Sequence, residues 1–206
     1  MARLRGTSTD DLLKGTGAND EINGLDGNDV IYGYGGRDAL TGDGGDDWVY
    51  GGDGNDHVLG GPGVDRLYGE NGDDTLVSGL GADHLWGGLG RDVFDYRNGT
   101  RESSLTLDAN GIAYGVDTIH DFEIGIDKID LSRIDADATT PVLQKTGNEA
   151  FSFVGTASFS NRAGELRYEI VEGNTYIHGD VNGDGVADLT IKLVGGLSLS
   201  AGDFFL

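Results

Sequence analysis

A nine-residue period runs through the first half of the chain and restricts its fold more than any other feature. Residues 15–95 are nine consecutive copies of the pattern Gly-Gly-x-Gly-x-Asp-x-aliphatic-x. The sixth position is aspartate in every copy, and the eighth is always apolar. A degenerate copy at 6–14 has Asp11 and Leu13 at these two positions, but Thr9 where the fourth-position glycine belongs. A short period of this kind is typical of a solenoid, in which each repeat contacts only its neighbours.

The residue types within the repeat predict the path of the backbone. Glycine tolerates positive φ, so the first six positions are expected to form a tight turn with exposed carbonyl oxygens. The last three positions should alternate out, in and out as a short strand, which places the eighth side chain in the interior. Two turns and two strands, from two consecutive repeats, would then close one coil, and successive coils would stack as parallel strands about 4.8 Å apart.

Stacked coils predict rows of carboxylates that require a cation. The aspartate of each repeat would lie beside the aspartate two repeats along, as Asp20 beside Asp38. Unit charges at this spacing repel by about 1 kcal/mol per pair even in bulk water. Calcium prefers carboxylate and carbonyl oxygens, so it would convert this repulsion into binding and make folding depend on the metal.

We therefore predict about seven or eight calcium ions in the roll. The predicted ligands are the sixth-position carboxylates and the fourth-position carbonyl groups of Asp11, Asp20, Asp29, Asp38, Asp47, Asp56, Asp65, Asp74, Asp83, Asp92, Gly27, Gly36, Gly45, Gly54, Gly63, Gly72, Gly81 and Gly90.

Composition and charge exclude several classes of protein. The 38 glycines are accompanied by only 2 prolines, which rules out a collagen-like chain. The net charge of −22 disfavours nucleic acids and anionic membranes as partners. There are no cysteines, so disulfides and thiolate metal sites are impossible. No segment approaches the ~20 apolar residues of a membrane span, and the N-terminus lacks the apolar core of a cleaved signal peptide.

The second half, residues 96–206, reads as strands without a helical period. The expected strands are 118–122, 128–131, 151–154, 165–171, 175–178 and 189–194. We predict an all-β protein, with a parallel β-roll over 6–95 followed by an antiparallel, β-sandwich-like cap that covers the end of the roll.

Two parts of the chain resemble known bacterial families. The repeats resemble those of the repeats-in-toxin family of secreted proteins. Beyond them, Asp117-Thr-Ile-His-Asp-Phe, Gly125-Ile-Asp-Lys-Ile-Asp-Leu-Ser and the closing Asp203-Phe-Phe-Leu are similar to the C-terminal domain of serralysin-type metalloproteases. This resemblance implies an extracellular protein that a type I secretion apparatus exports. It also implies an uncleaved C-terminal signal, here Asp203, Phe204, Phe205 and Leu206, and a catalytic or adhesive domain upstream in the parent protein.

The histidines argue against an enzyme within this chain. A serralysin active site needs a His-Glu-x-x-His helix to hold zinc, and no two of the four histidines have this spacing. The histidines are His57, His84, His120 and His178. We therefore predict a non-catalytic module.

A loop in the second half offers a further calcium site. Its side chains Asp180, Asn182, Asp184 and Asp188 occupy positions one, three, five and nine of an EF-hand-like loop, with Gly at six. Position twelve is Ile191, so the bidentate glutamate of a true EF-hand is missing. The loop is thus either a weaker calcium site or a plain turn rich in Asp and Asn.

Large rings are expected on one face of the roll. Tyr32, Tyr50, Tyr68 and Trp86 occupy the ninth position of every second repeat, and Trp48 lies beside them. Such a stripe either binds glycans or another protein, or is covered by another part of the parent protein. These features predict a calcium-triggered folding and secretion module. The alternative is a carbohydrate-binding accessory module of a secreted polysaccharide-modifying enzyme, such as an epimerase or lyase.

Overall fold

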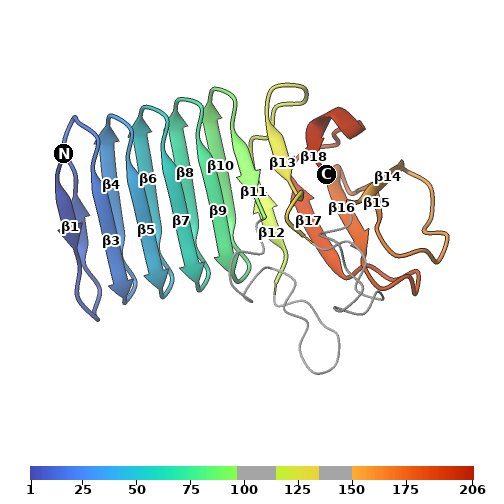
Figure 1. Cartoon of the computed structure of the whole chain (residues 1–206), viewed down its shortest axis with the longest axis horizontal. Coiled ribbons are helices and arrows are strands. Elements are labelled where there is room, and N and C mark those ends of the chain that lie inside the picture. The colour runs from blue at the N-terminus through green and yellow to red at the C-terminus, as the bar shows by residue number, and fades with distance from the viewer. Residues whose placement is uncertain (97–114, 135–149) are drawn as a thin grey trace.

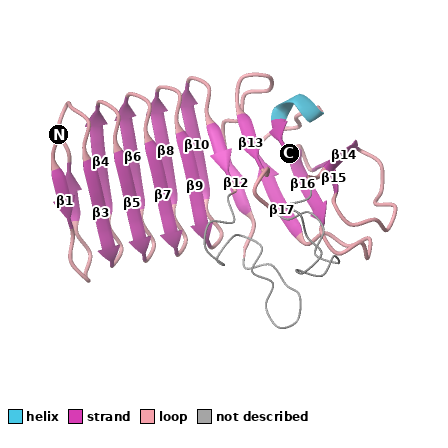
Figure 2. Cartoon of the chain, viewed as in Figure 1, coloured by secondary structure: helices cyan, strands magenta, loops and turns pink. Residues whose placement is uncertain are grey.

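A computed structural model describes residues 1–96, 115–134 and 150–206, and these form two long β-sheets stacked along a solenoid (Figure 1). Figure 2 shows this part of the chain as strands and loops, together with a short helical segment near the C-terminus. The repeats supply β1 (Arg3–Arg5), β2 (Leu12–Lys14), β3 (Glu21–Asp26), β4 (Val30–Gly35), β5 (Ala39–Gly44), β6 (Trp48–Asp53), β7 (His57–Pro62), β8 (Arg66–Asn71), β9 (Thr75–Leu80), β10 (His84–Leu89) and β11 (Val93–Asp95). The rest of the chain adds β12 (Asp117–Ile119), β13 (Lys128–Asp130), β14 (Ser152–Gly155), β15 (Glu165–Val171), β16 (Asn174–Asp180), β17 (Leu189–Leu193), the 3-10 helix η2 (Ala201–Asp203) and β18 (Phe204–Phe205).

The strand register confirms the coil of two repeats. The odd-numbered strands from β1 to β11 form one parallel sheet, and the even-numbered strands from β2 to β10 form the other. Ile22 pairs with Leu40 in the first sheet, and Val49 pairs with Leu67 in the second, so that each residue pairs with its counterpart two repeats along. The register also extends to the start of the chain, where Leu4 pairs with Ile22.

The eighth-position side chains form the core between the two sheets. From Ile22 to Phe94 all of them are at most 1% exposed. Leu4 and Leu13, in the first coil, are partly buried and pack against the same core. The core therefore consists of a single line of apolar residues per sheet, so each coil relies on its neighbours to cover it.

The predicted division of the repeat into a six-residue turn and a three-residue strand is wrong. The complete strands are six residues long, and positions one to three of the next repeat continue the strand that positions seven to nine begin. Leu25 and Asp26, for example, pair with Asp43 and Gly44 of the next coil. Only positions four to six turn the chain. The backbone hydrogen bonds between coils also include positions one to three, which the glycine pattern had assigned to the turn.

Glycine at the fourth position is required by a close approach between coils. Gly54 has a φ of 131°, and a Cβ there would collide with the carbonyl oxygen of Gly36 in the preceding coil. From Leu25 onward the second position is left-handed as well, even where it is not glycine. Leu25, Tyr34, Asp43 and Glu70 have φ between 67° and 81° there. Each left-handed residue other than glycine costs about 1–3 kcal/mol of conformational energy. The contacts within the roll must therefore stabilise a backbone conformation that these residues disfavour.

The second half of the chain continues both sheets of the roll. β12 pairs in parallel with β10, and β13 pairs in parallel with β11, so the register of the repeats passes residue 95. β18 then adds to β13, and β17 adds to β12. Among the described strands, antiparallel pairing is found only between β15 and β16 and between β16 and β17. The predicted antiparallel cap is therefore found in these three strands alone, while its other strands extend the parallel sheets, and the domain boundary at residues 95 and 96 stays a prediction.

The core register can be tested by truncating one inward and one outward leucine. Leu67→Ala should lower the free energy of unfolding by about 2–5 kcal/mol, because Leu67 is fully buried and its neighbours cannot close the cavity. Leu59→Ala, at an outward ninth position, should cost clearly less. Urea denaturation in calcium-containing buffer measures both, and equal losses would contradict the assignment of the two faces.

Candidate metal site

The structure brings the sixth-position aspartates together in two rows. Each row lies along one edge of the roll, where the chain turns from one sheet to the other (Figure 1). The first row contains Asp11, Asp29, Asp47, Asp65 and Asp83, and the second contains Asp20, Asp38, Asp56, Asp74 and Asp92. All of them except Asp11 are at most 3% exposed. The predicted neighbours, two repeats apart in the sequence, are indeed adjacent.

One oxygen of each carboxylate links consecutive coils. Asp29 donates its backbone N–H to Oδ1 of Asp47 at 2.8 Å, and Asp47 donates in the same way to Asp65 at 2.8 Å. In the other row, Asp38 donates to Oδ1 of Asp56 at 2.8 Å. The carboxylates thus form a hydrogen-bonded ladder along each edge, in which every aspartate holds the backbone of the preceding coil.

The second oxygen accepts no hydrogen bond in eight of these aspartates, although it is buried. The eight are Asp29, Asp38, Asp47, Asp56, Asp65, Asp74, Asp83 and Asp92. A buried carboxylate oxygen without a partner costs more than about 1 kcal/mol, so an array of eight calls for an explanation such as an ion.

Backbone oxygens lie next to these unsatisfied carboxylates. A Cβ placed on Gly51 would be 2.7 Å from Asp56 Oδ2 and 2.7 Å from the carbonyl oxygen of Gly69 in the next coil. The first-position glycine therefore leaves open a space that carboxylate and carbonyl oxygens line. Hard oxygen donors of this kind fit calcium.

The ion would depend on the backbone for many of its ligands. Among the described residues, no three His, Asp or Glu side chains gather closely enough to hold a metal by themselves. The fourth-position carbonyl group of Gly45 lies against the backbone of Gly63 in the next coil. The part of the fourth-position carbonyl groups in binding, and that of each predicted aspartate, stays a prediction.

Burial raises the pKa of the carboxylates toward the middle and the C-terminal end of the rows. Desolvation is the largest cause, and it brings the pKa of Asp56 to about 6, that of Asp74 to about 7 and that of Asp65 to about 8. The pKa of Asp83 also rises to about 8, first through desolvation and then through the charge of Asp117. Near neutral pH, Asp65, Asp74 and Asp83 therefore hold protons for much of the time unless a cation compensates for the lost hydration.

Two further aspartates continue the rows and were not predicted as members. Asp83 donates its N–H to Oδ1 of Asp117 at 3.0 Å, and Asp92 donates to Oδ1 of Asp127 at 3.0 Å. The segments Asp117-Thr-Ile and Asp127-Lys-Ile repeat the Asp-x-aliphatic core of the period. That signal was available, and Gly115 and Gly125 stand at the fourth position with positive φ, but the first- and second-position glycines of the repeat are absent.

The fifth position forms a second ladder that the sequence analysis missed. Asn28 Oδ1 accepts the N–H of Asp46 at 2.8 Å, and Asp46 Oδ1 accepts that of Val64 at 2.8 Å. On the other edge, Asn19 Oδ1 accepts the N–H of Arg37 at 2.9 Å. This ladder runs in the opposite direction to that of the sixth position, so Asn or Asp at position five ties each turn to the following one.

The loop at 180–188 has the hydrogen bonds of a tight turn. Asp180 accepts the N–H groups of Gly183 and Gly185, one on each carboxylate oxygen, at 2.6 and 2.9 Å. Asp188 Oδ2 accepts the N–H of Val181 at 2.8 Å. Asp184 Oδ1 accepts the N–H of Val186. Because these oxygens are already bonded to the backbone, the geometry is that of the plain turn, and calcium in this loop stays a prediction.

The aromatic stripe is a continuous stack. The centroids of Tyr32, Tyr50, Tyr68 and Trp86 follow one another at 4.8, 4.7 and 4.5 Å, with interplanar angles of at most 12°. His120 extends the stack beyond Trp86 at 4.0 Å. Trp48 lies to one side, with the guanidinium of Arg66 4.8 Å from its ring centroid. The rings thus cover one another's faces and leave mainly edges to a sugar, which does not favour carbohydrate stacking.

The C-terminal tetrapeptide is built into the fold. Asp203 is 1% exposed, and its carboxylate accepts the N–H groups of Gly125 and Ser200 at 3.0 and 2.8 Å. Phe204 of β18 is buried and pairs with Ile129 of β13, whereas Phe205 is 45% exposed. Leu206 packs against the core. Of the four predicted signal residues, Phe204 and Phe205 therefore form the last strand of the eight-stranded sheet, Asp203 ends η2 and Leu206 follows the strand.

Comparison with known proteins adds a family and a fold. Residues 15–206 match the family described as peptidase M10 serralysin C terminal. Among solved structures, the AlgE6R3 subunit of the mannuronan C5-epimerase of Azotobacter vinelandii is 24% identical, with a TM-score of 0.50 over 97% of this chain and 80% of that one. The AlgE6R2 subunit of the same enzyme is 23% identical, with a TM-score of 0.52 over 80% and 90%. These structures show a shared fold alone, and no curated protein matches the chain.

The part of the chain that the structure describes contains no helix with the length and apolar character needed to cross a membrane.

The raised pKa values predict how stability depends on pH when no divalent cation is present. A carboxyl group whose pKa is raised by folding contributes its full stability below its unfolded pKa of about 4, and loses it as the pH rises through the folded value. The metal-free free energy of unfolding should therefore fall between about pH 4 and pH 8, as Asp56, Asp74 and Asp65 ionise in turn. Far-UV circular dichroism in the presence of a chelator follows the folded fraction across this range, and that fraction should be largest near pH 4.

Asp65→Asn isolates the contribution of one buried carboxyl group. Asparagine stays neutral and keeps the oxygen that accepts the N–H of Asp47, so the metal-free variant should be more stable than wild type near pH 8 and less sensitive to pH. Asp26→Asn, at an exposed position, is the matched control for the loss of one charge. A metal-free stability that increases with pH, or equal effects of the two variants, would contradict this account.

Proposed function

Because the chain belongs to the peptidase M10 serralysin C-terminal family, we propose that it is a non-catalytic calcium-binding module whose roll folds when calcium enters the two aspartate rows. The family match is to the C-terminal region of these peptidases, which agrees with the lack of a His-Glu-x-x-His segment in the sequence. In this proposal the chain serves as a folding module for the protein that carries it.

The observation that carries the proposal is the array of eight buried carboxylate oxygens without hydrogen-bond partners. Bound calcium would place positive charge next to carboxylates that burial has removed from water. The sixth-position aspartates would hold the ion together with backbone carbonyl oxygens of the same edge. The backbone ladder through Oδ1 is complete without the metal, so the ion would act on the second oxygen of each carboxylate alone.

Folding would then depend on the location of the chain. Without calcium, each coil adds one buried carboxyl group to each row, and a single line of apolar residues per sheet has to offset the cost of burying its charge or of keeping it protonated. Extracellular calcium modules typically bind at about 10⁻⁴ to 10⁻³ M, which is far above the calcium level of a bacterial cytosol. We propose that the chain stays unfolded in the cell and folds outside.

Export before folding also fits the position of the C-terminus. Asp203 and Phe204 are buried in the folded chain, so a secretion apparatus could read them only before β18 forms. We propose that a type I apparatus recognises the last four residues in the unfolded chain. Calcium-driven folding outside the cell would then hide this signal and prevent return.

The carbohydrate-binding alternative stays a prediction. No contact in the described residues favours it over the structural reading of the ring stack. The likeness to subunits of a mannuronan C5-epimerase concerns the fold, and a shared fold does not transfer a ligand.

A calcium titration followed by far-UV circular dichroism tests the proposed function. We expect a cooperative transition from coil to sheet in about 0.1–1 mM calcium, because stacked coils fold together once the rows are neutralised. Magnesium should not produce it, since magnesium demands near-ideal octahedral geometry and dehydrates reluctantly. A sheet spectrum that is independent of calcium would show that the core alone supports the roll and would end the proposal.

Substitution of the two C-terminal phenylalanines distinguishes an effect on export from an effect on stability. Phe205→Ala should reduce export by a type I apparatus while changing the free energy of unfolding by less than about 0.5 kcal/mol, because Phe205 is exposed in the folded chain. Phe204→Ala removes a buried ring and should cost about 3–5 kcal/mol. The secreted fraction and urea denaturation are measured for both, and normal export of Phe205→Ala would contradict a role in the signal.

A further inference from the structure

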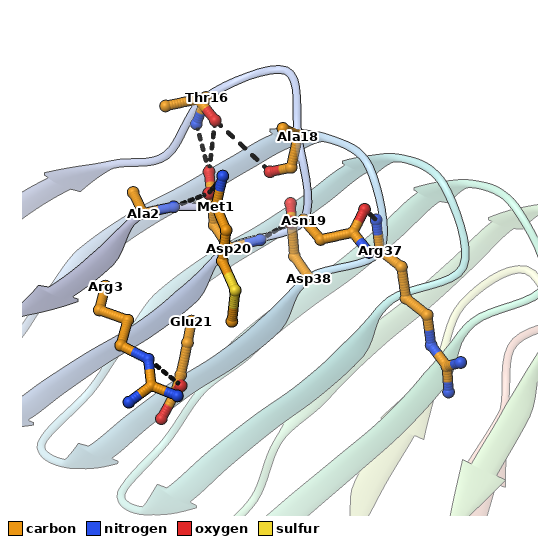
Figure 3. Close-up of polar contacts among 10 residues, drawn as sticks. All are labelled: Met1, Ala2, Arg3, Thr16, Ala18, Asn19, Asp20, Glu21, Arg37 and Asp38. Atoms are coloured by element: carbon orange, nitrogen blue, oxygen red, sulfur yellow. Dashed lines mark hydrogen bonds and ion pairs between the residues drawn. The ribbon is translucent and has the colours of Figure 1, made fainter.

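The first two aspartates differ from the eight that follow, because a threonine occupies their second oxygen. Asp20 Oδ2 accepts the N–H of Thr16 at 2.6 Å and the hydroxyl of Thr16 at 2.8 Å (Figure 3). Its other oxygen accepts the N–H of Ala2. In the other row, Asp11 Oδ2 accepts the N–H and the hydroxyl of Thr7 at 2.6 and 2.8 Å. The equivalent oxygen is without a partner from Asp29 to Asp92.

The fourth position of the repeat explains this difference. It is glycine from Gly27 to Gly90, always with positive φ, but it is Thr9 and Ala18 in the first two turns. None of residues 7–9 and 16–18 has positive φ. A side chain at the fourth position disfavours the left-handed turn, so the chain takes another path that brings the second-position threonine onto the carboxylate. Figure 3 shows Thr16 above Asp20, with its hydroxyl also 3.4 Å from the carbonyl oxygen of Ala18.

At the C-terminal end, hydrogen-bond donors of the protein also satisfy the second oxygen of the last aspartate in each row. Ser78, the one first-position residue between 15 and 95 that is not glycine, donates its hydroxyl to Asp117 Oδ2 at 2.9 Å. Asp127 Oδ2 accepts the N–H of Glu123 at 2.8 Å. Each row therefore has four aspartates with a free oxygen in the middle and one satisfied aspartate at either end.

We infer that calcium binds only in the middle of each row, through Asp29 to Asp92, and that Thr7, Thr16, Ser78 and the N–H of Glu123 replace the ion at the four ends. This inference rests on the proposed function, since it concerns where along the rows the calcium lies. A hydroxyl or N–H donor stabilises a carboxylate without a metal. In keeping with this, the N–H groups of Ala2 and Thr16 and the hydroxyl of Thr16 lower the pKa of Asp20, whereas burial raises that of Asp38, its neighbour in the row.

Two isosteric substitutions in one row test the N-terminal end. Asp11→Asn keeps an oxygen for Thr7, so it should leave the number of bound calcium ions unchanged. Asp29→Asn keeps the oxygen that accepts the N–H of Asp11 and replaces only the free oxygen, so it should lose at least one ion. Native mass spectrometry of the full chain at saturating calcium counts the ions directly, and it does not rely on any activity.

A gain of binding provides the converse test. Thr16→Gly combined with Ala18→Gly restores glycine at both left-handed positions of the first complete repeat and removes the hydroxyl that caps Asp20. The double variant should bind one more ion than wild type. Ala39→Gly, at an exposed seventh position of β5, is the control for added backbone freedom and should bind the wild-type number.

The outcomes separate this inference from the proposed function. Loss of an ion in Asp11→Asn, or an unchanged number in the double variant, would overturn the inference while the calcium module stands. A wild-type chain that binds no calcium would overturn both. A wild-type number kept by Asp11→Asn, reduced in Asp29→Asn and increased in the double variant would support the assignment of the ends.

Discussion

Buried carboxylates stacked from coil to coil are the constraint on which the rest of the structure depends. From Asp20 onward, each sixth-position aspartate accepts a backbone N–H from the coil before it, so the spacing of the coils and the position of the charge are fixed together. First-position glycine leaves room for the second oxygen, and fourth-position glycine lets neighbouring turns approach. The apolar eighth position then follows from the same turn, because the residue two places after the aspartate faces the interior.

The same constraint accounts for the strain in the turns. Leu25, Tyr34, Asp43 and Glu70 hold left-handed conformations that side chains disfavour, and they do so in repeats whose aspartate has a second carboxylate oxygen without a hydrogen bond. A fold with both features is poorly stable by itself. An external ligand that binds the rows is then able to decide whether the chain folds, which is the property that a calcium-dependent export module needs.

The period predicted much of this from sequence, since Asp20 and Ile22 recur so regularly that coil length, sheet pairing and core all follow from them. It did not predict the length of the strands, because backbone hydrogen bonds between coils leave no trace in residue type at positions one to three. The ends of the rows were also missed. Thr16 and Ser78 appear in the sequence only as departures from the pattern, and their hydrogen bonds to Asp20 and Asp117 become visible once the turns are placed in space. Asp117 and Asp127 were missed because the segments that separate them from the repeats interrupt the nine-residue count.

The stack of Tyr32, Tyr50, Tyr68 and Trp86 limits how such a protein can change its length during evolution. Gain or loss of one nonapeptide would move every following residue to the opposite sheet, which would break the ring stack and exchange the two aspartate rows from that point on. Gain or loss of two nonapeptides together would keep each ring above a ring and each carboxylate in its own row. Duplications and deletions in this lineage should therefore be retained as whole coils. Each such event adds or removes two nonapeptides, although the period of the sequence is one.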